Sequence, residues 1–419
     1  MKSVGYGAAL AAVFLLAACG QPADAPLTVS GSAVGLEADL LQRQIQRFND
    51  AHPRITVTLR ATPDAADQRH QLYVQWLNAH AADPDVLQLD AIWTAEFAAA
   101  GWIASLDRFE PSIDQFFPAA VDANRWNGSL YALPWFVDVG LLYWRTDLMP
   151  EAPSTMDQLR EFARHAQAEK KVPFGIVWQG ARYEGLVTVF LEYLGAFGGS
   201  ILDGQGRVAV DSAAAVQALT VMCDAIRVDR TVPGAVLGWQ EEQTRFAFQN
   251  GETALMRNWP YARPLLDDPV RSAVAGRFAI ASMPAADGGS ATAALGGSAL
   301  AVNAFSDRKT DAWEFIRFLL APEQMLERAR STGQYPPVPA LYDTPELADA
   351  LHADARSLRA IINRAVARPA TPVYSELSGI LQVSLHRALT GQQTPSEALR
   401  DAARDMRALL TRVHLQPAS

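Results

Sequence analysis

Two spacings of apolar residues alternate near the start of the chain. Short apolar runs, or apolar residues alternating with polar ones, predict strands at 27–32, 55–59 and 86–89. Between them, apolar residues recur at helical spacing within 37–49 and 72–77. The order strand, helix, strand, helix, strand is typical of a parallel sheet with right-handed crossovers. The pattern therefore predicts an α/β fold.

Two later segments carry the signature of a helix start. Thr155 and Thr394 are each followed, three residues later, by glutamine or glutamate, as in a capping box. The loosely composed segments 284–290 and 333–339 are candidate connections between parts of the fold. The helix after Thr394 should dock through one apolar face, formed by Leu399, Ala402, Met406, Leu409 and Val413.

The N-terminal residues predict an export signal. Lys2 gives a basic start, and residues 7–18 are almost entirely apolar and small. This run is shorter than the roughly 20 residues that a membrane-spanning helix needs. It ends in Leu-Ala-Ala-Cys19-Gly, which matches the bacterial lipobox. We therefore expect residues 1–18 to be a lipoprotein signal peptide, Cys19 to be lipidated, and residues 19–26 to form a tether.

Length and composition narrow the class of protein further. The chain has 419 residues, of which 49% are hydrophobic, and this length suggests two lobes of about 200 residues each. The only cysteines are Cys19 and Cys223, so a lipidated Cys19 leaves no intramolecular disulfide possible. The formal net charge is -9, which argues against nucleic acid as a partner.

The motifs of several enzyme classes are missing from the sequence. It contains no GxxxxGK[ST] loop, no GxSxG elbow, no HExxH and no CxxC. The seven histidines are not spaced as metal ligands. We therefore expect no catalytic residues, no cofactor and no metal.

Carboxylates, arginines and aromatic residues at element ends form the candidate site. Asp90 follows a buried strand, where ligands of open α/β sheets bind. Glu37 lies at a helix start and is open to interpretation as an ordinary helix-start acid. Asp138 interrupts the apolar run 133–143, and it is either functional or a structural aspartate bonded to backbone amides. Such a mixture suits a neutral sugar, because hydroxyls both donate and accept and aromatic faces cover pyranose C–H groups.

Six strings along the chain resemble one family of transport proteins. They are similar to the trehalose/maltose-binding branch of the solute-binding proteins of ABC importers, and they occur in that family's order across the mature chain. The strings are Asp85–Trp93, Tyr131–Tyr143, Trp178–Leu186, Arg257–Ala262, Leu295–Ser298 and Ala367–Tyr374.

The resemblance implies a two-lobe clamshell of the periplasmic-binding-protein type II, in which each lobe is a mostly parallel sheet flanked by helices. It implies an N-terminal lobe of residues 27–137 plus 298–340 and a C-terminal lobe of residues 138–297 plus 341–419. We expect a monomer in the periplasm, anchored to a bacterial membrane through Cys19. It would capture a neutral di- or oligosaccharide, such as trehalose or maltose, and deliver it to ABC permease subunits in the inner membrane.

The resemblance also assigns site residues. The implied positions are the polar contacts Glu37, Arg69, Asp90, Asp138 and Arg368, the stacking residue Trp259, and Phe136, Gly297 and Ser298. From the residues alone, Trp259 remains open to interpretation as a core tryptophan, and Arg69 as part of a polar helical face. The chain departs from the family in two places. Phe136 stands where relatives often carry tyrosine, and Ser298 stands where a tryptophan can follow the double glycine, so the preferred disaccharide stays open.

Two other classes of function compete with this interpretation. A lipid-anchored glycoside hydrolase acting on short glucosides would also use paired carboxylates and aromatic residues, with a defined separation between the two carboxyl groups. A sensor would bind sugar and signal without transport. Release of glucose from trehalose or maltose would favour the hydrolase.

Overall fold

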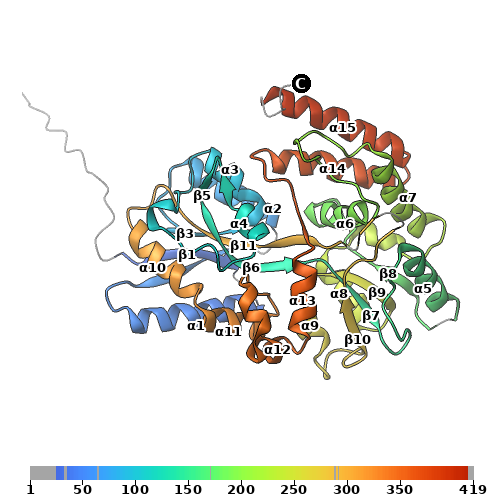
Figure 1. Cartoon of the computed structure of the whole chain (residues 1–419), viewed down its shortest axis with the longest axis horizontal. Helices are drawn as coiled ribbons and strands as arrows, with labels where there is room; N and C mark the ends of the chain where they lie inside the picture. Colours follow the sequence, from blue (N-terminus) through green and yellow to red (C-terminus); the bar gives the residue numbers. More distant parts are fainter. Residues whose placement is uncertain are drawn as a thin grey trace, which may run out of the picture.

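The computed structural model describes residues 25–32, 35–63, 66–169, 171–286, 289–290 and 292–413. The predicted signal peptide, Cys19 and most of the predicted tether lie outside these residues. The described chain forms two lobes, with α1, α3 and α10 in one and α5, α7 and α15 in the other (Figure 1).

The first lobe is built on a six-stranded sheet of order β12-β11-β3-β1-β2, in which β6 pairs with the other side of β11. β1 runs parallel to both β2 and β3, so the predicted strand and helix order is confirmed. β11 runs antiparallel to β3 and β6. The strands are β1 (Leu27–Ser32), β2 (Val57–Thr62), β3 (Val86–Asp90), β6 (Ala132–Val139), β11 (Ala294–Val302) and β12 (Val366–Ala367).

Helices cover both faces of this sheet. On one face α1 buries the apolar stripe predicted from its spacing, and Phe48 meets Phe315 of α10 edge to face at 5.0 Å. On the other face, Tyr73 of α2 packs with Trp93 and Phe97. The elements are α1 (Gly35–Ala51), α2 (Ala66–Asn78), α3 (Thr94–Ala99), α4 (Pro118–Asp122), α10 (Lys309–Leu319), α11 (Pro322–Thr332), the 3-10 helices Ala91–Trp93 and Asp107–Phe109, and the hairpin β4 (Arg125–Trp126) and β5 (Ser129–Leu130).

The second lobe has a four-stranded sheet of order β10-β7-β9-β8. Only β8 and β9 pair in parallel, whereas β7 is antiparallel to both β9 and β10. The expectation of a mostly parallel sheet is therefore wrong for this lobe, although the two-lobe α/β fold is confirmed. The strands are β7 (Leu141–Arg145), β8 (Phe174–Val177), β9 (Thr253–Asn258) and β10 (Phe278–Ala281).

Long helices pack on the second sheet. The capping box at Thr394 and Glu397 is present in both directions at the start of α15. Thr155 caps Gln158 N of α5, but the Gln158 side chain accepts from Ser154 N instead of from Thr155. The elements are α5 (Met156–Ala168), α6 (Glu184–Ala196), α7 (Ala213–Arg227), α8 (Glu241–Gln249), α9 (Ala262–Leu266), α12 (Pro345–Leu351), α13 (Ala355–Ile362), α14 (Tyr374–Leu389), α15 (Pro395–Arg412), and the 3-10 helices Gly234–Gly238 and Pro339–Asp343.

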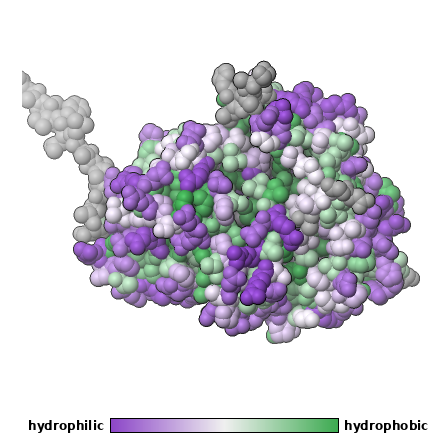
Figure 2. All heavy atoms as spheres, viewed as in Figure 1, coloured by the Kyte–Doolittle hydropathy of each residue, from purple (hydrophilic) through white to green (hydrophobic). Residues whose placement is uncertain are grey.

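Two antiparallel strands carry the chain between the lobes. β6 pairs with β11 from Ala132 to Val139 and continues through Gly140 into β7 (Figure 1). The expected lobe boundaries at 137/138 and 297/298 fall inside these two strands. In the same orientation, hydrophilic residues dominate the outer surface and hydrophobic residues show mainly in recesses (Figure 2). Within the described ranges, none of the helices is both long and apolar enough to cross a membrane.

Candidate functional site

Asp90 lies at the C-terminal end of β3, opposite Ser298 of β11. Its Oδ1 accepts hydrogen bonds from Ile92 N at 3.2 Å and from Arg368 Nη2 at 2.9 Å. Ser298 Oγ in turn accepts from Gln88 Nε2 at 3.2 Å. The fold therefore brings together three predicted site residues that are far apart in the sequence, Asp90, Ser298 and Arg368.

The edge of β11 beside Asp90 is interrupted. β3 pairs with β11 as far as Ser298, and β12 pairs with it again at Leu295. Gly296 and Gly297 lie between these pairings. Gly297 has φ 124°, and a Cβ atom there would come within 2.3 Å of Phe136 O. Gly297 is therefore required by backbone conformation and by its close approach to β6.

A pocket opens at this interruption. Its cavity volume is about 30 Å³, within about 460 Å³ of empty space that includes open solvent. Four predicted residues line it, namely Phe136, Gly297, Ser298 and Arg368, together with Ile92 beside Asp90. Most of the other lining side chains are apolar, so the pocket offers a few polar groups within apolar walls, as small-molecule sites do.

Asp138 is the electrostatically unusual member of the site. It pairs with Gly296 across the strands, and its Oδ1 is enclosed without a hydrogen-bond partner among the described residues. Burial, together with the charges of Glu37 and Asp90, raises the pKa of Asp138 to about 7, and the charges of Arg257 and Arg328 oppose the shift. Backbone amides therefore do not satisfy this oxygen.

Glu37 belongs to the same charged cluster. It lies in the first turn of α1 and accepts from Gln334 Nε2 at 2.8 Å. Gln334 Oε1 accepts from Arg328 Nη1, also at 2.8 Å, so the glutamine joins acid and base. Arg328 lies 3.8 Å from the centre of the Trp135 ring. Burial lowers the pKa of Arg328 to about 10, while Glu37 opposes that change.

Trp259 follows β9 and lies beside Asp138. A Cβ atom on Gly296 would be 3.3 Å from Trp259 Cζ3 and 3.5 Å from Asp138 Cβ, so the glycine leaves room for the indole. The indole Nε1 donates to Glu241 Oε1 at 3.4 Å, and the Arg257 guanidinium lies 4.0 Å from the ring centre. The side chain is half-buried, unlike a core tryptophan such as Trp178.

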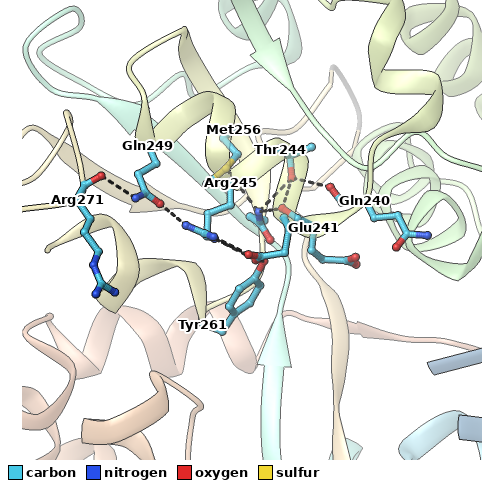
Figure 3. A network of polar contacts seen from close by, with 10 residues as sticks. Gln240, Glu241, Thr244, Arg245, Gln249, Met256, Tyr261 and Arg271 are labelled. Carbon is cyan, nitrogen blue, oxygen red and sulfur yellow. Dashed lines mark hydrogen bonds and ion pairs between the residues drawn. The ribbon is translucent and has the colours of Figure 1, made fainter. Parts of the chain in front are cut away.

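A polar network joins α8 to β9 and to the segment around Arg271 (Figure 3). Asn258 Nδ2 donates to Glu241 O at 3.1 Å and to Thr244 Oγ1 at 3.2 Å. Further along the helix, Gln249 Nε2 donates to Arg271 O at 2.8 Å. The Asn258 contacts fix the N-terminal part of α8, where Glu241 meets the indole, and the Gln249 contact fixes its C-terminal end.

Arg69 is placed by other contacts. Its Nη1 donates to Pro63 O at 3.2 Å, and its guanidinium lies 5.5 Å from the centre of the Trp93 ring. The side chain is buried on α2, so Arg69 is not part of an exposed polar face.

Glu184 is a site residue that the sequence reasoning missed. It lies at the start of α6 and is buried, and its Oε1 accepts from Arg368 Nη1 at 3.1 Å and from Tyr374 Oη at 2.8 Å. Burial raises the pKa of Glu184, and the charge of Arg368 opposes that shift. Its position at a helix start after a buried strand is the same signal that singled out Glu37. Gln334, Arg328 and Glu241 were also missed, and no motif marks them.

No candidate metal-binding site is found in the part of the chain that the structure describes. There, no group of three or more histidine, cysteine, aspartate or glutamate side chains is arranged to hold an ion. Of the predicted site residues, Phe136, Gly297, Ser298 and Arg368 line the pocket, whereas Glu37, Asp90, Asp138 and Trp259 are not among its lining residues.

The fold and the site together define a two-lobe α/β ligand-binding protein whose pocket lies where the crossing strands join the lobes. The model of the family "Bacterial extracellular solute-binding protein" matches residues 35–326. The chain belongs to this family, which confirms the resemblance at that level.

Known proteins agree with this assignment. The "Probable ABC transporter-binding protein" of Deinococcus radiodurans is 34% identical over 413 residues, covering 94% of this chain and 96% of that protein. The solved structure "Maltose bound T. maritima MalE3" is 40% identical with a TM-score of 0.86, covering 92% of this chain and 100% of that one. The "Arabinooligosaccharide-binding protein" of Halalkalibacterium halodurans is 23% identical and covers 74% of this chain and 71% of that protein.

Proposed function

We propose that this protein is the sugar-capturing subunit of an ABC importer and that it binds a neutral disaccharide of the trehalose or maltose type. The observation that carries the proposal is the enclosed Oδ1 of Asp138 beside the Trp259 indole. The similarity to a maltose-bound structure and to a probable ABC transporter-binding protein supports it.

The chemistry of the site suits a polyhydroxyl ligand. Asp138 accepts hydroxyl donors, and Arg368 donates to ring or hydroxyl oxygens. The Trp259 and Phe136 rings cover pyranose C–H faces and remove them from water. An uncharged ligand is favoured because Glu37, Asp90 and Asp138 already share the site with Arg328 and Arg368, so the site carries charges of both signs.

Binding involves no bond making in this proposal. The sugar docks on one lobe, and rotation at the crossing strands brings up the other lobe to complete its contacts. The sugar closes the lobes only by binding the closed state better than the open state. The closed protein then docks on the permease.

We further propose that Cys19 is lipidated after removal of residues 1–18, that residues 19–26 tether the protein, and that it acts as a monomer outside the cytoplasm. The division into lobes at 137/138, 297/298 and 340/341 belongs to the same proposal. Labelling with radioactive palmitate tests the anchor when the parent protein is compared with the Cys19→Ser variant. Absence of label in the parent protein would contradict it.

Isothermal titration calorimetry tests the sugar. The mature protein is titrated with trehalose, maltose, sucrose, glucose and maltotriose. The same titrations are then repeated with the Asp138→Ala variant. We expect at least one disaccharide to bind and the substitution to weaken binding by about tenfold or more. Binding of no sugar would refute the function, and unchanged binding in Asp138→Ala would refute the site.

The alternative of a glycoside hydrolase has one observation in its favour, because a carboxyl group with a pKa of about 7 is also what a general acid needs. Release of glucose from trehalose or maltose, abolished in Asp138→Asn, would establish it. We expect the disaccharide to be recovered intact.

A further inference from the structure

A fully buried ion pair lies behind the site. Glu192 of α6 and Arg257 of β9 are both 0% exposed, and Arg257 Nε donates to Glu192 Oε2 at 2.9 Å. Each partner has a second contact. Arg257 Nη1 donates to Gln179 Oε1 at 3.1 Å, and Glu192 Oε1 accepts from Ala294 N at 3.2 Å. Such additional hydrogen bonds are what makes a buried pair tolerable.

The pair lies against two of the connections between the lobes, the crossing strands that contain or adjoin Gly140 and Ala294. Gly140, the one residue between β6 and β7, approaches so closely that a Cβ atom would fall 1.6 Å from Glu192 Oε1 and 2.6 Å from Arg257 Nη2. Ala294, the first residue of β11, receives the Gly140 N–H at its carbonyl oxygen at 3.1 Å. The carboxylate of Glu192 is therefore bonded to one crossing strand and packed against the other.

On its other side, the pair reaches the ligand site. The Arg257 guanidinium lies 4.0 Å from the centre of the Trp259 ring. Its charge also lowers the pKa of Asp138 against the effect of burial. Arginine, unlike lysine, can make the forked bond to Glu192 and lie flat on the indole at the same time.

We propose that Arg257 is a positioning residue that holds the Trp259 indole in place for the sugar and, through Glu192, ties it to both strands that cross between the lobes. This inference rests on the proposed sugar-binding function. A rotation at Gly140 or Ala294 during closure displaces the Glu192 carboxylate, and the indole moves with it. The position of the Trp259 indole thus depends on the backbone that connects the lobes as well as on its own loop.

The first test uses Arg257→Lys, which keeps the charge but loses the fork and the flat stacking surface. We expect sugar affinity to fall by about tenfold. The matched control is Arg145→Lys, because Arg145 lies on β7 of the same sheet and makes a comparable fork to Asp147 with both contacts at 2.6 Å. The control should bind sugar like the parent protein. Equal affinity in Arg257→Lys and the parent would overturn the proposal.

The second test separates positioning from stability. Arg257→Met alone leaves a buried carboxylate unpaired and can fail to fold. The double variant Arg257→Met/Glu192→Met removes both charges and should fold, but its sugar affinity should stay at least about tenfold low. Parent-like affinity in the folded double variant would overturn the proposal.

A pH profile supplies a readout that a purely structural role would not change. The charges that act on Asp138 are those of Glu37, Asp90, Arg257 and Arg328. The Asp138 charge in turn raises the pKa values of Tyr143, Tyr335 and Tyr342. The midpoint of the pH dependence of affinity should rise in the double variant, because Arg257 is one of the main charges acting on the pKa of Asp138 and Glu192 is not. It should stay unchanged in Arg257→Lys. An unchanged midpoint in the double variant would count against the role of Arg257.

Fluorescence distinguishes failure of this inference from failure of the proposed function. The chain has ten tryptophans, so the signal of Trp259 is taken as the difference between each protein and its Trp259→Phe version. That difference spectrum should change in Arg257→Lys and not in Arg145→Lys. If the parent binds no sugar, the proposed function fails, whereas the spectra still decide whether Arg257 positions Trp259.

Discussion

Arg368 Nη2 lies 2.9 Å from Asp90 Oδ1, and this ion pair joins the C-terminal segment to the end of β3. The same guanidinium donates through Nη1 to Glu184 Oε1 of α6 at 3.1 Å. One arginine thus holds a carboxylate from each lobe beside the pocket. Its side chain is only 4% exposed, so water screens neither interaction well.

Replacing Arg368 should therefore affect both folding and binding. Arg368→Met leaves Glu184 buried without its cation, and we expect the free energy of unfolding to fall by about 3 kcal/mol. Sugar affinity should fall as well. Urea unfolding and calorimetry measure the two effects. The control Arg207→Met removes an exposed pair with Asp203 and should cost at most about 1 kcal/mol; an equal cost in both variants would contradict the bridging role.

Asp138→Asn should make the sugar-free protein more stable at pH 8. The pKa of Asp138 is about 7 in the folded protein and near 3.8 in the unfolded one, so its contribution to stability falls as pH rises through that window. The asparagine has no such loss, and we expect a gain of about 2 kcal/mol at pH 8 and little change at pH 4. Urea unfolding at both pH values measures it.

Asp147→Asn is the control of opposite sign. Hydrogen bonds from Arg145 hold the pKa of Asp147 below its usual value, so this carboxylate stabilises the fold above that range and loses its effect in acid. The variant should be less stable than the parent at pH 8. A gain of stability at pH 8 in Asp147→Asn, or a loss of stability at pH 8 in Asp138→Asn, would contradict these effects of the two charges.

Sugar affinity should depend on pH through Asp138. Hydroxyl donors favour the ionised carboxylate, so sugar affinity should decline below a pH of about 7. Near neutrality, sugar binding should therefore release a proton from Asp138. Calorimetry in two buffers that differ in ionisation enthalpy measures the released proton. Asp138→Asn should release none, and parent-like proton release in that variant would assign the effect to another group.

Gly297→Ala should disrupt the pocket edge. The residue has φ 124°, and the added Cβ would lie 2.3 Å from Phe136 O, so backbone must shift. We expect a loss of about 2 kcal/mol or more and weaker sugar binding. Gly204→Ala, with no atom within 4 Å of the added Cβ, should stay within about 0.5 kcal/mol of the parent. Comparable losses in both would remove the argument for Gly297.

Sequence reasoning located the first three strands, the two helices between them, and the starts of α5 and α15, because local patterns carry these elements. The apolar stripe of α1 and the capping box at Thr394 depend on residues within a few turns of each other, and both are present in the structure. The mixed second sheet could not be predicted in this way. Its pairings join β7, β9 and β10, which are separated by long stretches of chain.

Part of the candidate site was also predicted from local sequence patterns. Asp90 and Asp138 stand out because a charge ends or interrupts an apolar run. Glu184 and Arg328 become visible only through partners that lie far away in the sequence, Arg368 for one and Gln334 for the other. Their burial, and hence their effect on the site, follows from how the lobes and helices pack.

The sequence by itself determined the α/β class, the acids at strand ends and the family resemblance, since strand order, charge placement and motif order are written along the chain. Only the tertiary structure decided that Asp138 Oδ1 is enclosed without a partner, that Arg368 bridges both lobes, and that Glu192 and Arg257 lie between the crossing strands and Trp259. Burial and through-space charge set these properties, and both depend on residues that meet only after the chain has folded.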